Sequence, residues 1–271
     1  MTRALVVRAR LELAVAWGAL IGTLGGLIGL GGAEFRLPVL IGFFRYPTAQ
    51  AIVINLMVSL VTVVFSFLFR TGLAGLGSVQ PHLPVVLNLI VGTLIGAYLG
   101  THLASRVGGR ALTRVVSLWL IALSFLLIAH DLVFHLEAAV LADLPRFIVG
   151  VIAGVVIGTA SSLLGVAGGE LIIPTLILLF GIDVKIAGSL SLLVSIPTIL
   201  AGLLRYRALR RFEGLSQHGT FIGSLAVGSI IGALVGSVLV RYAPGALLTV
   251  LLGIILLISA VRLFTRPGDH A

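Results

Sequence analysis

Two ten-residue stretches decide how this chain folds: GLGGAEFRLP at residues 29–38 and GVAGGELIIP at residues 165–174. Each contains glycines followed by a glutamate and a proline, and each interrupts a long apolar run. Glycine tolerates the left-handed backbone that ends a helix, and proline is tolerated early in the next one, where its missing N–H costs least. We therefore predict a break at each stretch, then a short helix that begins at Glu34 or Glu170 with its proline in about the first turn.

The composition places these breaks inside a membrane. Of the 271 residues, 59% are hydrophobic and 10% are charged, whereas soluble domains carry about 25% charged residues. A membrane β-barrel alternates apolar and polar residues, but here the apolar runs are long and unbroken. There is no cysteine, which excludes a disulfide scaffold. The sequence therefore excludes a soluble enzyme and predicts an all-α polytopic membrane protein.

Charged and turn residues divide the chain into long and short apolar segments. The short ones, Phe35–Phe44 and Leu171–Phe180, reach only about half way across a bilayer. A polar linker at 131–146 separates a first transmembrane repeat, 1–130, from a second, 147–271, within one integral membrane domain. The segments long enough to span are Leu11–Leu30, Thr48–Phe69, His82–Ala104, Ala111–His130, Phe147–Val166, Val184–Leu204, Leu215–Val240 and Pro244–Phe264.

The two parts are related by an internal repeat. Adding 136 to a residue number aligns the two halves without a gap. The matches of glutamate, proline and histidine are not expected from an apolar composition, so they indicate a duplication. A pair of glycine ladders also matches, and such ladders are typical of tight helix packing. The matched positions include Glu34 with Glu170, Pro38 with Pro174, His82 with His218, and Gly92, Gly96 and Gly100 with Gly228, Gly232 and Gly236.

The arginines predict how the repeats are oriented. The net charge is +9. If each first segment and its short partner enter and return on one side, the clusters at 106–114 and 205–211 share the side of the N-terminus. Arg70 and the acidic linker then fall on the other side. The positive-inside rule favours this arrangement, which gives inverted repeats of about four spanning helices plus one half-helix, with both termini cytoplasmic. Inverted repeats are typical of secondary transporters, whose sites lie near the midplane.

The breaks favour a small anion as ligand. A helix N-terminus offers free N–H groups and a partial positive charge, so two such ends meeting near the midplane would form an anion site. Glu34 and Glu170 oppose an anion only when they are ionised, and burial disfavours the ionised form. Both are therefore candidates for proton coupling. The alternative is that the glycine turns only join packed helices and that each glutamate only caps a helix.

Further polar residues complete the candidate site. Arg36 is an intramembrane arginine, a residue type that is usually functional; the alternatives are snorkelling or a salt bridge to Glu34, which would leave Glu170 as the titrating group. Asn55 and Ser59, like Ser191 and Ser195, share a helix face, and they either donate to an oxyanion or join helices. The predicted substrate-binding set is Gly31, Gly32, Ala33, Glu34, Arg36, Asn55, Ser59, Gly168, Gly169, Glu170, Ser191 and Ser195.

At Gly29–Pro38, Gly165–Pro174 and Ala187–Ser191 the sequence resembles the sulfite exporter TauE/SafE family. With the doubled layout the resemblance covers nearly the whole chain, although the first copy departs from the usual glycine-rich pattern at 33–36. It implies a permease of the bacterial inner membrane that exports sulfite, sulfoacetate or a related anion.

We therefore expect a secondary transporter of small sulfur-containing oxyanions, with protons as the candidate coupling ion. Its expected partners are the anion and the lipid bilayer. No catalytic residue, metal, cofactor or nucleic acid is expected. A passive anion channel, an importer of an unrelated small anion and a membrane scaffold are the alternatives.

Overall fold

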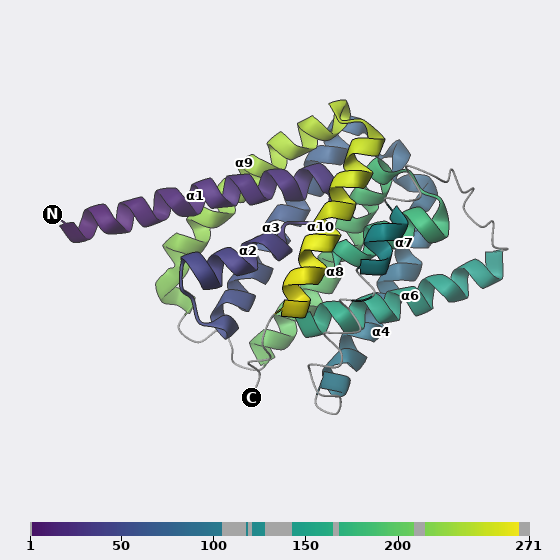
Figure 1. Ribbon diagram of the computed structural model, residues 1–271, viewed down its shortest axis with the longest axis horizontal. Coiled ribbons are helices and arrows are strands. Elements are labelled where there is room, and N and C mark those ends of the chain that lie inside the picture. The colour runs from purple at the N-terminus through teal and green to yellow at the C-terminus, as the bar shows by residue number, and fades with distance from the viewer. Residues whose placement is uncertain are drawn as a thin grey trace.

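The computed structural model describes residues 2–104, 118, 121–127, 143–164, 168–208 and 215–265. These residues are folded almost entirely as helices (Figure 1). The long helices are α1 (Thr2–Ile28), α3 (Thr48–Ala74), α4 (Leu83–Ala104), α6 (Asp143–Leu164), α8 (Val184–Ala208), α9 (Gly219–Tyr242) and α10 (Gly245–Thr265). The short elements are α2 (Ala33–Pro38), the π-helix η1 (Val39–Phe43), α7 (Gly169–Phe180) and the 3-10 turns η2 (Leu76–Ser78), η3 (Gln80–His82) and η4 (Leu215–His218).

Apolar helices of membrane-spanning length confirm the predicted fold class, an all-α polytopic membrane protein. Within the described ranges, five helices are long and apolar enough to cross a membrane. They are Arg8–Ile28, Thr48–Leu73, Leu76–Leu99, Val184–Ala208 and Gly219–Tyr242. Phe147–Ser161, Gly169–Phe180 and Gly245–Val261 are shorter apolar helices. The predicted segment Ala111–His130 and the linker at 131–146 fall largely outside the described residues.

The two halves of the chain are interleaved. The first helix of each half packs along the fourth helix of the other, so α1 lies against α9 and α6 lies against α4. In Figure 1 these two pairs lie on either side of the molecule, with α8 and α10 between them. The central helices α3 and α8 contact each other, and each also contacts the α4 or α9 of the opposite half. Within the described residues, each cluster of buried apolar side chains therefore contains residues of both halves.

Glycines close the two outer helix pairs, as the ladders predict. A Cβ added at Gly96 of α4 would overlap the Val155 carbonyl group of α6, and one at Gly232 of α9 would overlap the Ala19 carbonyl group of α1. Gly92, Gly228 and Gly236 meet the facing backbone in the same way. Because only glycine permits this approach, the structure confirms the packing interpretation at these positions. The side-chain surroundings at Gly100 are not among those that the structure describes.

Both predicted helix breaks are present. Gly29, Gly31 and Gly32 have φ values of 97°, 80° and 74°, and Gly168 has 77°. These values lie in the left-handed region that glycine adopts readily, so α2 begins directly after Gly32 and α7 directly after Gly168. Gly165 lies outside the described residues. The first-turn position predicted for the prolines is wrong, because Pro38 is the last residue of α2 and Pro174 lies in the interior of α7.

Each broken helix pair folds back as a hairpin. In the first hairpin (α1, α2 and η1), the Arg10 side chain of α1 donates to the Phe44 carbonyl oxygen at 3.2 Å, just after η1 ends. In the second hairpin (α6 and α7), a Cβ on Gly150 of α6 would lie 3.0 Å from the ring of Phe180, the last residue of α7. Each short helix therefore returns toward the end from which its long partner starts.

Candidate functional site

The two helix breaks meet inside the molecule. A Cβ on Gly169, the first residue of α7, would lie 3.1 Å from both the Cα and the carbonyl oxygen of Leu30 in the first break. It would also lie 3.3 Å from the hydroxyl group of Ser191 on α8. One residue earlier in the first break, Gly29 packs on the backbone of Gly188. The fold thus brings both glycine motifs and α8 to one place.

Arg36 is fully buried one turn into α2, with 0% of its surface exposed. Its Nη1 donates to the Ser59 hydroxyl at 2.8 Å. Its Nη2 donates to the Thr62 hydroxyl at 3.0 Å and to the Ser229 hydroxyl at 3.4 Å. Its Nε has no hydrogen-bond partner in the described part of the chain. All of these partners are neutral, so they orient the guanidinium group without balancing its charge.

The alternative interpretation of Arg36, a salt bridge to Glu34, is wrong. The described residues contain one ion pair, Arg8 with Glu12, at the surface. Both carboxylate oxygens of Glu34 are buried and lack a hydrogen-bond partner there. Residues two apart on a helix do not face each other, and α3 and α9 present three hydroxyl groups to Arg36. Snorkelling is also excluded by the complete burial of Arg36.

The remaining polar candidates are buried near the same helices. Among the described residues, neither the amide nitrogen nor the amide oxygen of Asn55 has a hydrogen-bond partner, and the Ser191 hydroxyl has none. Ser195 and Glu170 are also buried. Of the two predicted roles, joining helices therefore explains Ser59, which contacts Arg36 of α2. It does not explain Asn55 or Ser191. Unpartnered buried polar groups are rare and indicate a ligand or a solvent molecule.

Sequence reasoning missed Thr62 and Ser229 as partners of Arg36. Thr62 continues the face of Asn55 and Ser59 along α3, and this helical spacing was a signal that could have included it. Ser229 is 193 residues from Arg36 along the chain. It comes from the opposite half, so no local pattern indicates the contact.

Arg70 is a second buried arginine that the sequence analysis placed outside the membrane segments. Instead, α3 continues to Ala74, and Arg70 is only 4% exposed. Its guanidinium group donates to the Leu27 carbonyl oxygen at the end of α1 at 3.2 Å. It also donates to the Ser189 hydroxyl at 3.2 Å and to the Lys185 carbonyl oxygen at 3.5 Å, both on α8. Arg70 thus joins α1, α3 and α8 beside the breaks.

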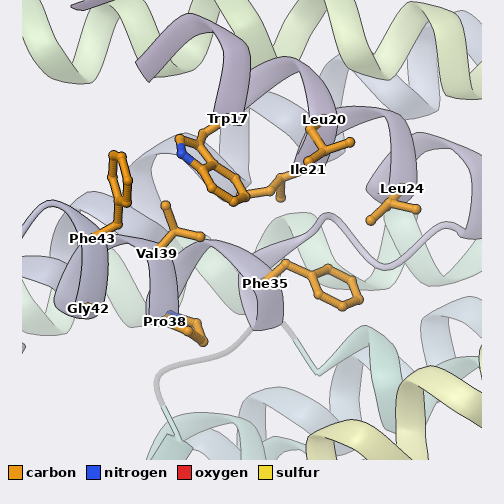
Figure 2. A pocket seen from close by; sticks show the side chains of 9 residues that line it. All are labelled: Trp17, Leu20, Ile21, Leu24, Phe35, Pro38, Val39, Gly42 and Phe43. Atoms are coloured by element: carbon orange, nitrogen blue, oxygen red, sulfur yellow. The ribbon is translucent and has the colours of Figure 1, made fainter. Parts of the chain in front are cut away.

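An apolar cavity of about 510 Å³ lies between α1 and the α2–η1 segment. Figure 2 shows the side chains of the two walls facing each other across it. The cavity is lined by Trp17, Leu20, Ile21, Leu24, Phe35, Pro38, Val39, Gly42 and Phe43. None of these is charged, so this cavity suits a hydrocarbon chain and not an oxyanion. The oxyanion candidate Arg36 is not among the lining residues and instead contacts hydroxyl groups of α3 and α9.

Comparison with known proteins gives one family. A family model described as "Sulfite exporter TauE/SafE" matches residues 5–127 and 149–270. The two matched ranges together take in both glycine motifs and every residue described above as a candidate. No curated protein and no solved structure matches the chain.

Proposed function

This chain belongs to the sulfite exporter TauE/SafE family, and we propose that it is a secondary transporter that exports a small sulfur-containing oxyanion. The family and the apolar helices make it a multi-pass membrane transport protein. Sulfite and organosulfonates such as sulfoacetate are the proposed substrates, and the bacterial inner membrane is the proposed location.

The observation that carries this proposal is the environment of Arg36. A buried charge is expensive unless it is paired, and here three hydroxyl groups hold the guanidinium group while no carboxylate within the described residues pairs with it. An oxyanion accepts charge-assisted hydrogen bonds from arginine and would supply the missing charge. The unpartnered groups of Asn55 and Ser191 and the backbone N–H groups at the start of α7 are the further proposed donors.

The hairpin contacts support an inverted arrangement of the two halves. The first hairpin closes at Phe44, directly before α3, and the second closes at Phe180, directly before α8. At the far end of α3, Arg70 contacts Lys185 at the start of α8. Since α3 has 27 residues and a helix rises about 1.5 Å per residue, this supports hairpins that enter from opposite faces. The meeting point of the breaks would then lie between the faces, as in other inverted-repeat transporters.

Protons are the proposed coupling ion, with Glu34 and Glu170 as the carriers. Both carboxyl groups follow a glycine break directly, and the Glu34 oxygens are buried without a partner in the described structure. When Glu34 is protonated, the charge of Arg36 is left for the substrate. When Glu34 is ionised, it competes with the substrate for that charge. The protonation state of Glu34 would therefore control how strongly the anion binds.

Flux into proteoliposomes tests the function. The purified chain is reconstituted, and uptake of sulfite, sulfate, thiosulfate, sulfoacetate and taurine is measured with and without an imposed pH difference. We expect flux of sulfite or sulfoacetate that a pH difference accelerates. Protein-free liposomes and the Arg36→Ile variant are the controls. If no anion in the panel moves, the transporter proposal is wrong.

The same assay separates the alternatives. A passive anion channel would conduct without any acceleration by a pH difference beyond its effect on the anion's own charge. An importer would move the anion only in the direction opposite to that proposed. To detect this, the protein must be reconstituted with a known orientation. A scaffold would give no flux at all. The unpartnered carboxyl group of Glu34 favours coupled transport over a channel, because a fixed charge opposing the anion serves no purpose in a passive pore.

A further inference from the structure

The internal repeat allows the surroundings of Arg36 to be compared with an equivalent place in the other half. Arg36 corresponds to Ile172, and its partner Thr62 corresponds to Thr198. Its other partner, Ser229, corresponds to Thr93. In the first half, Arg36 lies between the two hydroxyl groups and donates to both. At the equivalent position of the second half, the Thr198 and Thr93 hydroxyl oxygens lie 3.3 Å apart, with no side chain between them.

The equivalent position in the second half, at Ile172, has no need of a ligand. Ile172 is fully buried and apolar. The Thr198 hydroxyl donates to the Val194 carbonyl oxygen at 3.0 Å, and the Thr93 hydroxyl donates to the Ile90 carbonyl oxygen at 3.0 Å. Each hydroxyl is therefore satisfied within the protein, and no charge is left over. At the Arg36 position, by contrast, no group in the described chain balances the guanidinium charge, and the Arg36 Nε has no hydrogen-bond partner.

Resting on the proposed function, we propose that the chain binds one oxyanion, at Arg36 in the first half only, and that Thr62 and Ser229 are positioning residues for the guanidinium group. The Thr62 hydroxyl donates to the Val58 carbonyl oxygen at 2.8 Å, which leaves its lone pairs directed at Arg36. Thr62 lies on α3 and Ser229 lies on α9, so the two halves of the molecule hold the same nitrogen, Nη2, of the guanidinium group. A shift of α9 against α3 would then change the hold on the anion.

Anion binding to the purified full-length chain tests this proposal, with sulfite and sulfoacetate as probes in titration calorimetry. We expect one anion per chain. Loss of a hydrogen bond to a charged group corresponds to about a tenfold loss of affinity or more, so we expect Thr62→Val and Ser229→Ala each to weaken binding by about that factor. Thr62→Ser keeps the hydroxyl and should restore parental affinity. Arg36→Ile, which copies the second half, should abolish binding.

The equivalent residues of the second half are the matched controls. Thr93→Val and Thr198→Val remove the same groups from the same kind of helix, and we expect affinities within about twofold of the parent. The thermal unfolding midpoint of every variant is measured alongside, since a purely structural role for Thr62 would lower this midpoint without a selective loss of affinity.

Three results would overturn the inference. They are two equal sites per chain, equal weakening by the first-half and second-half variants, and no recovery with Thr62→Ser. A parent chain that neither binds nor transports any oxyanion would overturn the proposed function together with this inference. A parent that transports the anion but binds two per chain would overturn the inference alone.

Discussion

Gly188 marks the point at which the first helix break presses on α8. A Cβ there would lie 2.6 Å from the Arg70 Nη1 and would also overlap the Ile28 carbonyl group. We expect Gly188→Ala to destabilise the protein by about 1–3 kcal/mol, as overpacking does in other cores. Gly202→Ala on the same helix is the control, because its new methyl group would meet only the Leu56 side chain at 3.8 Å.

The measurement for Gly188 is thermal unfolding in detergent. Because alanine forms helices better than glycine, Gly202→Ala should be neutral or should stabilise by up to about 1 kcal/mol. Equal midpoints for Gly188→Ala and Gly202→Ala would show that the break does not pack on α8 as described.

Arg70 is expected to act on stability and not on the anion. Its guanidinium group satisfies carbonyl oxygens of α1 and α8, and the end of α1 carries partial negative charge. Arg70→Met should therefore lower stability by about 1–3 kcal/mol, since two buried acceptors lose a charged donor. Exposed Arg205→Met is the control and should change stability by less than about 0.5 kcal/mol. A loss of anion affinity without a loss of stability would instead make Arg70 part of the binding site.

Glu170 and Glu34 are expected to carry the proton coupling. Glu170→Gln keeps the shape of a protonated carboxyl group and removes its titration, so anion binding should persist while acceleration by a pH difference is lost. Glu34→Gln is the matched variant in the other hairpin. Both are measured as flux in proteoliposomes across an imposed pH difference. Unchanged pH-driven flux in both variants would assign these carboxyl groups to structure and would favour the channel.

At this scale the sequence predicts which residues are unusual but not which residues they meet. Arg36 stands out because its repeat equivalent is isoleucine. Its nearest charged neighbour in sequence is Glu34, and a pairing of the two was one of the alternatives that the local pattern allowed. The actual partners lie 23, 26 and 193 residues away, and contacts at such separations depend on helix packing that no local pattern encodes.

At the scale of elements, the glycine ladders explain why α1 and α9 lie so close. Leucine at Gly232 would enter the α1 backbone near Ala19, so we expect Gly232→Leu to separate these helices and to prevent stable folding. Gly223→Leu on the same helix is the control, because nothing lies within 4 Å of its new Cβ. The measurement is the fraction of monodisperse protein in size-exclusion chromatography after extraction in detergent. Comparable yields of both variants would contradict the packing described for α9.

The short helices show how far element-level prediction reaches. Glycine, glutamate and proline within an apolar run are enough to place both breaks, because each residue type has a local conformational cause. The later position of the prolines has a different origin. Pro38 lacks the N–H group that would bond four residues back, and in the structure α2 ends there and continues as the wider π-helix η1. Two residues of η1, Val39 and Phe43, line the apolar cavity beside α1.

At the scale of the whole molecule, the exchange of partners between the halves agrees with the prediction of one integral membrane domain. Sequence comparison finds the repeat, since equivalent residues keep their spacing. It does not predict that α1 packs on α9 and α6 on α4, because both the partner within a half and the partner in the other half present apolar and glycine-rich faces. The packed glycines decide between these two partners, and their role can be recognised only when the facing backbone is known.

The orientation of the molecule in the membrane gives the last prediction. Both termini are expected in the cytoplasm, with the loop after η1 on that side and the end of α9 on the other. Two contacts support this pairing of ends. Tyr46, in the loop after η1, lies 3.4 Å from the ring nitrogen of His218 at the start of α9, while Lys185 donates to the Arg241 carbonyl oxygen at the end of α9 at 3.4 Å. The chain has no cysteine, so single cysteines report cleanly. Arg45→Cys should react with a membrane-impermeant maleimide only in inverted vesicles, and Tyr242→Cys, at a position 80% exposed, only in intact cells. Cysteines near Arg110 and Arg210 should react only in inverted vesicles, like Arg45→Cys, and one near Glu137 only in intact cells, like Tyr242→Cys. Labelling of Arg45→Cys and Tyr242→Cys from the same side would rule out this topology, and with it the inverted repeat on which the midplane site depends.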